Sequence, residues 1–464
     1  MPPRRLRHLF LCDLLKSNVL SLFHVDTKVE LNQAVAMILY LYRIVVWFLT
    51  PLIFGMLLLR SIREPEYRHR ISERFGLLSS ELSTDCICFH TVSAGETISA
   101  APVIQELIKQ DQNLRILITT MTPTGSAMAK KIFGGGVEHS YMPYDYQFAV
   151  KRFFNRVQPK ILILMETELW PNLVNEAAKR RIPVICINAR LSEKSASRYK
   201  FIRPLITRLL QQVDLVACQY DGHVSRFIDL GLDPKKARAL GNMKFDLSVS
   251  PNLITDAQDR RKRLRLDHRL VWIVASTHDG EEEVVLTVYK KLKVKHEDLL
   301  LVLVPRHPPR SKLVGSIFER EGVKVQYESE RGSLHDMDEV DILIGDVMGS
   351  LFDLYGLADI ATVGGSFVDV GGHNPIEPAA YGLPILVGPY QYNFSEVMLE
   401  FETHGGLKTV KDSEDLYDVL HSLLLSKEKR QSMGKRALQT IEKNKGSTYQ
   451  LVELLKSRIL DSSI

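Results

Sequence analysis

Lys160–Ala189, KILILMETELWPNLVNEAAKRRIPVICINA, is the stretch of sequence that decides the fold. It begins with a short apolar run, continues through a proline-initiated segment of helical pattern, and ends in a second apolar run rich in β-branched residues. Short apolar runs of this kind are typical of buried strands, and a helix between two of them indicates a β-α-β unit. The stretch therefore predicts parallel strands joined by helices.

The same alternation extends in both directions from this stretch. From about residue 84 the apolar runs are CICFHTV, RILITTM, KILILME, PVICINA and LVACQ, until a charged stretch from Asp256 to Asp267 interrupts them. The pattern then restarts with VWIVAST, LLLVLVP, VKVQY, DILIGD, IATVGG and PILVG. We expect an α/β protein with two Rossmann-like halves that face a cleft. Because parallel sheets bind ligands at the carboxyl ends of their strands, the residues after each run are the candidate site residues.

An apolar stretch, Val35–Leu59, precedes the first half. It is long enough to cross a bilayer, since a helix of about 20 residues suffices. Arg43 lies within it and Pro51 would kink a helix, so a segment lying in the membrane interface remains an alternative. Basic residues follow the stretch and favour a cytoplasmic location for the rest of the chain, although the leader before it is basic too. We expect retention as an anchor, because no cleavage site follows.

These observations divide the chain into five expected segments. If two such sheets face each other, we expect one to bind a nucleotide and the other to bind an acceptor. The segments are an N-terminal extension (residues 1–33), a membrane anchor (34–60), an N-terminal, acceptor-binding Rossmann-like domain (61–250), a linker (251–268), and a C-terminal, nucleotide-binding Rossmann-like domain with terminal helices (269–464).

Composition narrows the possible partners. The chain has 60 Lys and Arg beside 55 Asp and Glu, a net charge of +5, and its basic residues are spread along its length. This pattern favours a phospholipid surface or an anionic small substrate and argues against a nucleic-acid partner. The five cysteines are odd in number and mostly lie in apolar runs, which indicates reduced core residues. Cys86 and Cys88 have no second ligand pair near them in sequence, so we expect no zinc site.

Glu96 follows the first strand of the first half, within Ser93-Ala94-Gly95-Glu96. Ser93 and Glu96 have the spacing of a capping box, and spacing alone favours that structural role. The functional alternative is a general base, because transfer to a sugar hydroxyl needs a carboxylate that removes the proton.

Further charged residues follow other strands of the first half. Glu166 and Glu168 come directly after a buried run, and one of them is expected to cap a helix or to orient an acceptor. Arg190 and Lys244 follow two later strands, and either could neutralise a carboxylate or phosphate, although a solvated surface residue is the common explanation for each.

Three segments of the second half fit a nucleotide. Pro305 and Arg306 follow LLLVLV and are suited to a phosphate contact, and Met348-Gly349-Ser350 precedes a helix. The most specific segment is Gly364–Pro389, GGSFVDVGGHNPIEPAAYGLPILVGP, whose glycines let backbone amides approach a phosphate. Within it, Asn374 and Pro375 begin a helix, and Glu377 could accept hydrogen bonds from a ribose diol.

Together these motifs resemble the 3-deoxy-D-manno-octulosonic acid (Kdo) transferases of Gram-negative bacteria. The resemblance covers nearly all of the chain after about Val35, and its marks stand in the family's order: YRHRISERFG, HTVSAGET, TTMTPTGS, METELWPN, INARLS, GNMKFD, VPRHP and GGHNPIEPAA.

The resemblance implies a GT-B fold with an anchor helix at the cytoplasmic face of the inner membrane. It implies inverting transfer of Kdo from CMP-Kdo to the lipid A precursor lipid IVA, without a metal or other cofactor. Glu96 would be the general base, and Glu166 and Lys244 would stabilise the transition state. The residues that would contact CMP are Pro305, Arg306, Met348, Gly349, Ser350, Asn374, Pro375, Ile376 and Glu377. Some family members have Glu where this chain has Ser350, so a backbone role is expected there.

Two other functions remain open on the sequence. One is a GT-B hexosyltransferase or nucleotide-sugar epimerase that uses a UDP-sugar, which would require groups that bind a pyrophosphate. The other is an inactive, membrane-attached binding protein, which the simultaneous presence of Glu96, Glu166, Lys244 and Glu377 disfavours.

Overall fold

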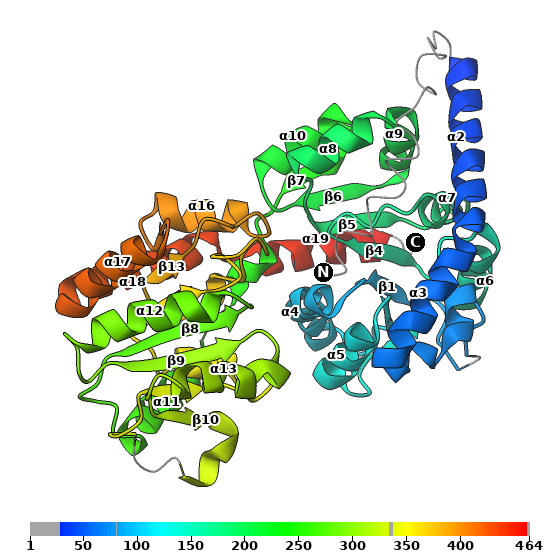
Figure 1. Cartoon of the computed structure of the whole chain (residues 1–464). Coiled ribbons are helices and arrows are strands. Elements are labelled where there is room, and N and C mark those ends of the chain that lie inside the picture. The colour runs from blue at the N-terminus through cyan, green and yellow to red at the C-terminus, as the bar shows by residue number, and fades with distance from the viewer. Residues whose placement is uncertain (1–27, 80, 248, 334–336, 462–464) are drawn as a thin grey trace. The chain divides into compact units, whose positions relative to one another are not determined.

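The computed structural model describes residues 28–79, 81–247, 249–333 and 337–461. The chain divides into two compact units (Figure 1). Unit 1 runs to Met243 and resumes at Gly446, and unit 2 comprises Lys244–Lys445.

Unit 1 is built on a seven-stranded sheet in the order β3-β2-β1-β4-β5-β6-β7. The strands are β1 (Ile87–His90), β2 (Ile116–Thr120), β3 (Glu138–Tyr141), β4 (Ile161–Met165), β5 (Val184–Ala189), β6 (Leu215–Cys218) and β7 (Ala237–Ala239). Neighbouring strands pair in parallel, as predicted. The order of strands along the chain reverses between β1 and β4, so the topological switch point lies between their carboxyl ends.

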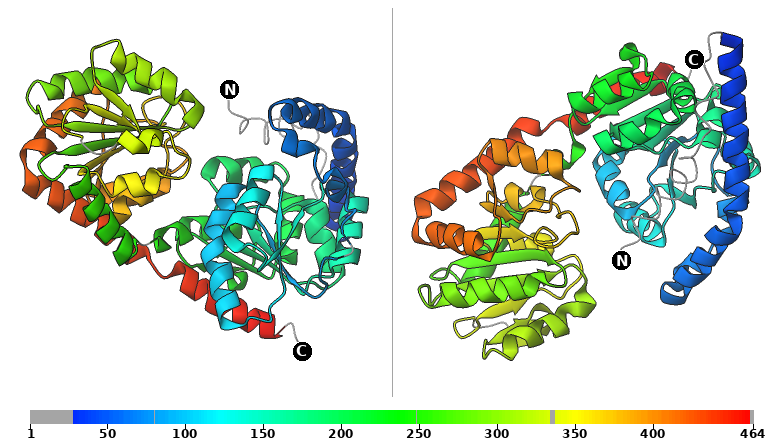
Figure 2. Two further views of the ribbon diagram at one scale, coloured as in Figure 1. Left: turned by 90° about the horizontal axis from the view of Figure 1, so that it is seen from below. Right: turned by 45° about the horizontal axis from the view of Figure 1, so that its top comes forward.

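Helices cover both faces of this sheet (Figure 2). The helices of unit 1 are α2 (Lys28–Phe48), α3 (Thr50–Arg63), η3 (Pro65–Arg68), η4 (Ile71–Phe75), α4 (Ala94–Gln110), α5 (Pro123–Phe133), α6 (Gln147–Val157), α7 (Pro171–Lys179), α8 (Glu193–Lys200), α9 (Arg203–Gln212), α10 (Asp221–Asp229), η5 (Pro234–Lys236) and α19 (Ser447–Asp461); η6 (Met243–Asp246) joins the units. The sequence of β4 is apolar throughout because both faces of the strand are buried. Leu162 and Leu164 face one core, and Ile161 and Ile163 face the other.

Unit 2 repeats this architecture with a sheet in the order β10-β11-β9-β8-β12-β13-β14. Its strands are β8 (Val271–Thr277), β9 (Leu300–Pro305), β10 (Val325–Tyr327), β11 (Ile342–Ile344), β12 (Ile360–Val363), β13 (Ile385–Val387) and β14 (Leu407–Thr409). Its helices are α11 (Pro251–Arg263), α12 (Glu281–Lys293), η7 (Pro308–Arg310), α13 (Ser311–Glu319), η8 (Glu328–Ser333), α14 (Leu351–Tyr355), α15 (Ile376–Ala380), α16 (Ser395–Thr403), α17 (Ser413–Leu425) and α18 (Lys427–Asn444). Here the switch point lies between β8 and β12.

The division into units differs from the expected segments at three places. Unit 2 begins at Lys244, although the N-terminal domain was expected to extend to residue 250. The expected linker contains α11, which belongs to unit 2 because Arg261 donates to the Leu357 carbonyl and pairs with Asp359 at 3.2 Å. The last helix, α19, belongs to unit 1, because Leu451 and Leu455 pack into the core that contains residues of α4. Local periodicity in the sequence does not reveal that α11 packs on unit 2 or that α19 packs on unit 1.

The apolar N-terminal segment forms two helices instead of one. Within the described residues no single helix is long and apolar enough to cross a membrane, but Ala36–Phe48 and Thr50–Ile62 together pass that test and are bent by 43°. The break at Leu49 precedes Pro51 in the first turn of α3, where a missing N–H is tolerated. The expected extension lies outside the described residues up to residue 27.

The cysteines in and beside the strands of unit 1 agree with the prediction. Cys86, Cys88, Cys186 and Cys218 are buried free thiols. Burial raises the pKa of each thiol, which keeps it protonated and unreactive. Cys12 lies outside the described residues.

Candidate active site

Glu96 lies in the first turn of α4, directly after β1 and beside the switch point of unit 1. The Ser93 hydroxyl accepts a hydrogen bond from the Glu96 N–H at 3.4 Å and donates one to the Glu96 carboxylate at 3.1 Å. The Val92 N–H donates to the other carboxylate oxygen at 2.8 Å. The capping geometry therefore forms, and it fixes the carboxylate at the carboxyl end of the sheet.

Burial, together with the negative charges of Glu168 and Glu166, raises the pKa of the Glu96 carboxyl to about 8. The hydrogen bonds from Val92 and Ser93 act in the opposite direction but are weaker. A carboxyl group with a pKa near neutrality can take up and release a proton under working conditions. A helix cap alone would not require this pKa.

Glu166 and Glu168 follow β4, across the switch point from Glu96. The Glu166 carboxylate pairs with the Arg190 guanidinium at 3.0 Å, and its backbone is in the left-handed region, with φ of 54°. The Glu168 carboxylate accepts a hydrogen bond from the Trp170 indole at 2.8 Å. The site thus contains three neighbouring carboxyl groups and one guanidinium. Of these, Glu168 was noted in the sequence but not assigned a catalytic role, although its charge acts on Glu96 more strongly than that of Glu166.

Lys244 is the first residue of unit 2, whereas Glu96 and Glu166 belong to unit 1. Its ammonium group lies 5.2 Å from the centre of the Phe394 ring. The residue before it, Met243, donates its backbone N–H to the Asn188 side chain at 3.4 Å, which fixes the chain at the end of unit 1.

Three of the predicted nucleotide contacts come together in unit 2. Arg306 follows β9, while Asn374 and Glu377 lie at the start of α15. The Asn374 side chain donates to Glu377 at 3.2 Å and accepts from the Ile376 N–H at 3.1 Å. Burial raises the pKa of the Glu377 carboxyl, while the Asn374 hydrogen bond and the Arg306 charge lower it. Arg306 therefore lies within electrostatic reach of Glu377, although 71 positions separate them in sequence.

The predicted segment Met348-Gly349-Ser350 lies between β11 and α14. Gly349 has φ of +90°, and Met348 is 78% exposed. The buried Ser350 hydroxyl donates to Glu328 at 2.5 Å, and Glu328 also pairs with Arg260 at 3.3 Å. The Ser350 side chain is therefore engaged within the protein, and the expected backbone contact with CMP stays a prediction.

The structure adds a carboxylate that sequence reasoning missed. Glu281, 1% exposed, accepts hydrogen bonds from four backbone N–H groups, those of His278 (2.9 Å), Gly365 (2.7 Å), Ser366 (3.1 Å) and Phe367 (2.9 Å). It ties the turn after β8 to the glycine-containing turn after β12. Its position in the first turn of α12 resembles that of many capping residues, so the sequence gives little signal for this longer-range role.

Sequence reasoning also missed a pair of histidines. His278 follows β8 and His373 precedes α15, and their Nε2 atoms lie 2.8 Å apart, with the rings stacked at 5.0 Å. His373 stood inside the most specific motif without an assigned role, and His278 stands directly after a strand, which was the only available signal.

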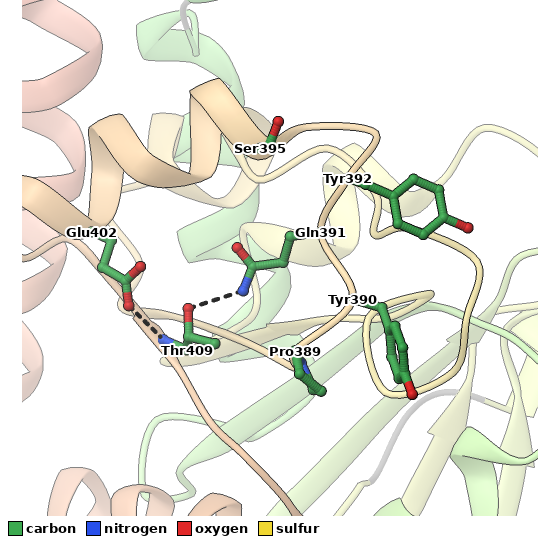
Figure 3. Close-up of a pocket in the computed structure, with 7 residues that line it drawn as sticks. All are labelled: Pro389, Tyr390, Gln391, Tyr392, Ser395, Glu402 and Thr409. Carbon is green, nitrogen blue, oxygen red and sulfur yellow. Dashed lines mark hydrogen bonds between the residues drawn. The ribbon is translucent and has the colours of Figure 1, made fainter. Parts of the chain in front are cut away.

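A surface pocket of about 580 Å³ lies beyond β13 (Figure 3). Gln391 donates to Thr409 at 2.9 Å and Thr409 donates through its N–H to Glu402 at 3.4 Å, which closes one side of the pocket. The lining residues, all described, are Pro389, Tyr390, Gln391, Tyr392, Ser395, Glu402 and Thr409, and none is a predicted site residue.

In the part of the chain that the structure describes, no three His, Cys, Asp or Glu side chains are grouped so that they could hold a metal ion. The independence of the reaction from metal stays a prediction.

Comparisons with known proteins agree with this architecture. Residues 69–247 match the family described as 3-deoxy-D-manno-octulosonic-acid transferase (kdotransferase), and residues 271–440 match the glycosyl transferases group 1. The 3-deoxy-D-manno-octulosonic acid transferase of Haemophilus influenzae is 38% identical, over 88% of this chain and 95% of the relative. That of Bordetella pertussis is 30% identical, over 79% of this chain and 86% of the relative.

Solved structures show the same fold at low identity. The UDP-GlcNAc 2-epimerase of Neisseria meningitidis is 15% identical with a TM-score of 0.55, over 80% of this chain and 99% of that chain. A glycosyltransferase of Rickettsia africae is 14% identical with a TM-score of 0.53, over 82% of this chain and 99% of that chain. The two parallel-sheet units thus form a GT-B-like glycosyltransferase fold, and the chain belongs to the family of 3-deoxy-D-manno-octulosonic acid transferases.

Proposed function

We propose that this enzyme transfers Kdo from CMP-Kdo to lipid IVA, the lipid A precursor, in lipopolysaccharide synthesis. Family membership supports the transferred sugar, and the site in unit 1 supports the chemistry. The single observation that carries the mechanism is the Glu96 carboxyl, which is fixed at a switch point and has a pKa of about 8.

Glu96 acts as the general base in this proposal. Its carboxylate removes the proton from a hydroxyl of the acceptor while the hydroxyl oxygen attacks the anomeric carbon of Kdo. The bond between that carbon and the phosphate oxygen breaks, and CMP leaves with the bonding electron pair. Attack from the side opposite the phosphate inverts the configuration. The neighbouring negative charges of Glu166 and Glu168 increase the proton affinity of Glu96, which makes it a stronger base once it is ionised.

Glu166 and Lys244 stabilise charge that develops in the transition state. Positive charge grows on the sugar ring as the bond to phosphate breaks, and a carboxylate favours it. Negative charge grows on the departing phosphate, and an ammonium or guanidinium group favours that. Arg190 holds the Glu166 carboxylate at 3.0 Å, and this contact fixes its orientation.

The carboxyl ends of the unit 2 strands hold CMP. Arg306 offers a fork of donors to the phosphate, and Glu377 offers acceptors to the ribose hydroxyls. Pro305 fixes the backbone before Arg306, the Met348-Gly349-Ser350 backbone supplies further contacts, and Asn374, Pro375 and Ile376 position Glu377 through the hydrogen bonds at the start of α15.

The bent pair α2–α3 attaches the enzyme to the cytoplasmic face of the inner membrane. One side of α2 packs on unit 1, where Tyr42 donates to Asp145 at 2.8 Å and Arg43 donates to Asn172 at 2.9 Å. The two helices also expose large apolar side chains, among them Phe48 (80%) of α2 and Leu58 (64%) and Leu59 (69%) of α3. A helix fastened along one side to a water-soluble domain favours attachment in the membrane interface over spanning. Flotation with phosphatidylglycerol-containing vesicles tests this attachment. Phe48→Ser should weaken binding to the vesicles, and it leaves the contacts that Tyr42 and Arg43 make with unit 1 unchanged.

Transfer is tested directly by mass spectrometry. The detergent-purified enzyme is incubated with lipid IVA and with CMP-Kdo generated in place, beside the Glu96→Gln variant and an active control transferase. Mass increments of Kdo that appear with the wild-type enzyme and vanish with the variant support the function and the base together. Failure of the wild-type enzyme while the control works would exclude this donor and acceptor, and UDP-sugars would then be screened.

A further inference from the structure

Trp170 binds Glu168 through both its side chain and its backbone. It follows β4 as the residue before α7, and its indole N–H donates to the Glu168 carboxylate at 2.8 Å. Its backbone N–H donates to the Glu168 carbonyl at 3.1 Å, which closes the loop between the two residues. The Glu168 side chain is half-buried, so water competes with its protein partners for the carboxylate. The indole hydrogen bond therefore favours one position of this carboxylate.

The Trp170 ring is held in turn by the end of β1. It lies edge to face against the His90 ring, with centroids 5.0 Å apart and planes at 78°, a favourable arrangement for two aromatic rings. His90 is the last residue of β1, is fully buried, and has its Nδ1 atom 3.0 Å from the Thr119 hydroxyl. The loop after β4 is thus fixed to the strand that leads into Glu96.

The hydrogen bond from Trp170 leaves the charge of Glu168 in place. An indole N–H is a neutral donor, so it orients a carboxylate without cancelling its charge. Glu166 differs, because it pairs with the Arg190 guanidinium at 3.0 Å, whose positive charge offsets its own. This difference agrees with the strength of the two effects on Glu96, since the charge of Glu168 raises the pKa of Glu96 more than that of Glu166 does.

The other elements around Glu96 bring neutral or apolar groups. Burial lowers the pKa of the His90 imidazole to about 4, so this ring is neutral near pH 7. The helices α5 and α19 pack on α4, and the core that they share with it contains apolar side chains, among them Ala129 and Leu455. Within the described residues, the charged groups that act on Glu96 are those of Glu168 and Glu166.

We propose that Trp170 is a positioning residue, which holds the Glu168 carboxylate within electrostatic reach of Glu96 and so sets the pH range in which Glu96 acts as a base. This inference rests on the proposed function, in which Glu96 removes the proton of the acceptor hydroxyl. Trp170 acts through Glu168 and touches neither substrate. The residue before α7 is therefore part of the control of the base, although it follows a different strand.

The test is the dependence of kcat on pH in the full-length enzyme, measured with lipid IVA and with the enzyme that generates CMP-Kdo in excess at each pH. Trp170→Phe keeps an aromatic ring against His90 but removes the indole N–H. The midpoint of the profile should move to lower pH, because the Glu168 carboxylate then turns toward water. The rate at pH 7 should rise by up to about fivefold, and by no more than in Glu168→Gln. The rate at pH 9 should match that of the wild-type enzyme, which also shows that the variant is folded.

A double variant tests whether Trp170 acts through Glu168. In Glu168→Gln/Trp170→Phe the midpoint should equal that of Glu168→Gln alone, because no charge is left for the indole to position. Two shifts that add would show that Trp170 acts on Glu96 by another route, and they would overturn the inference.

Unit 2 offers a matched control. Trp272 of β8 is fully buried, and its indole N–H donates to the Thr362 hydroxyl at 2.9 Å. Trp272→Phe also removes one indole hydrogen bond, but in the other unit, so the midpoint of its pH profile should remain that of the wild-type enzyme.

Two further results would overturn the inference. An unchanged or raised midpoint in Trp170→Phe would show that Glu168 keeps its position through its other contacts. A raised KM for lipid IVA with an unchanged midpoint would show that Trp170 contacts the acceptor instead. A wild-type enzyme that transfers no Kdo would reject the proposed function itself, so the two failures are read from different proteins.

Discussion

The carboxyl ends of the two sheets carry different side chains although the sheets share one architecture. At the switch point of unit 1 stand Glu96, Glu166 and Glu168, and at that of unit 2 stand His278, Arg306 and His373. The fold decides where a site forms, since both sets occupy the ends of parallel strands. The residues after the strands decide its chemistry, for which we propose removal of a proton in unit 1 and binding of the nucleotide phosphate in unit 2.

The buried carboxylates of the two units sharpen this contrast. Glu96 accepts one backbone N–H and has a pKa of about 8, raised first by burial and then by the negative charges of Glu168 and Glu166. Glu281 accepts four backbone N–H groups, which satisfy its charge within the protein. The first is suited to proton transfer, whereas the second holds two turns in place.

Glu96→Gln removes the base from the acidic site and should have the largest effect. We expect kcat to fall by about a thousandfold, within the range for loss of a general base, with little change in the KM for CMP-Kdo. Initial rates of Kdo transfer measure both constants. The control is Glu106→Gln, on the exposed side of the same helix, which should retain full activity. A fall in kcat of less than about tenfold in Glu96→Gln would assign the base to another residue.

Glu281→Gln tests whether the buried carboxylate of unit 2 is structural. The amide group of Gln would face backbone N–H donors that the carboxylate now satisfies, so we expect unit 2 to lose ~3 kcal/mol of unfolding free energy. Urea denaturation followed by circular dichroism measures this loss. The exposed neighbour Glu283→Gln should change stability by less than about 0.5 kcal/mol. Equal stability of the two variants would contradict the structural role.

Arg306→Gln removes the fixed positive charge from the basic site. We expect the inhibition constant of CMP to rise by about 10- to 100-fold, because a charge-assisted contact to phosphate is lost. The pH profile of the rate should stay as in the wild-type enzyme, since Glu96 is unaffected. Arg320→Gln, an exposed arginine of the same unit, serves as the control, and an unchanged CMP constant in Arg306→Gln would place the phosphate elsewhere.

Glu168→Gln should have the smallest effect and tests the electrostatic coupling within unit 1. Because Glu96 must be ionised to act, the wild-type rate should rise with pH, with its midpoint near the Glu96 pKa of about 8, and level off above about pH 9. Removing the negative charge of Glu168 lowers the Glu96 pKa, so the midpoint should move to lower pH. At pH 7 only about a tenth of Glu96 is ionised at a pKa near 8, so the rate there should rise by about two- to fivefold.

The rate of Glu168→Gln at pH 9 should match that of the wild-type enzyme. Glu168→Asp, which keeps the charge, should retain the original midpoint. A midpoint that stays in place in Glu168→Gln would show that burial alone sets the Glu96 pKa.

Particular residues show which structural features could be predicted from the sequence and which could not. The spacing of Ser93 and Glu96 predicted a capping box, and the box is present, but spacing could not reveal that Glu168 lies close enough to act on the same carboxyl group. The apolar run Val35–Leu59 predicted one helix, whereas a break at Leu49 divides it and contacts with unit 1 hold α2 on one side. The sequence identified the motif around Asn374 and Glu377, but it could not show that His373 within this motif lies beside His278.

The sequence by itself determined the two α/β halves, the strand ends where sites form, and the family, because strand burial, helix capping and motif order are local properties of the chain. The tertiary structure alone decided that α19 returns to unit 1, that the Ser350 hydroxyl is engaged by Glu328, and that two histidines 95 positions apart share a hydrogen bond. Contacts between distant segments depend on how whole elements pack, and the pKa of a side chain depends on the charges and burial that this packing creates.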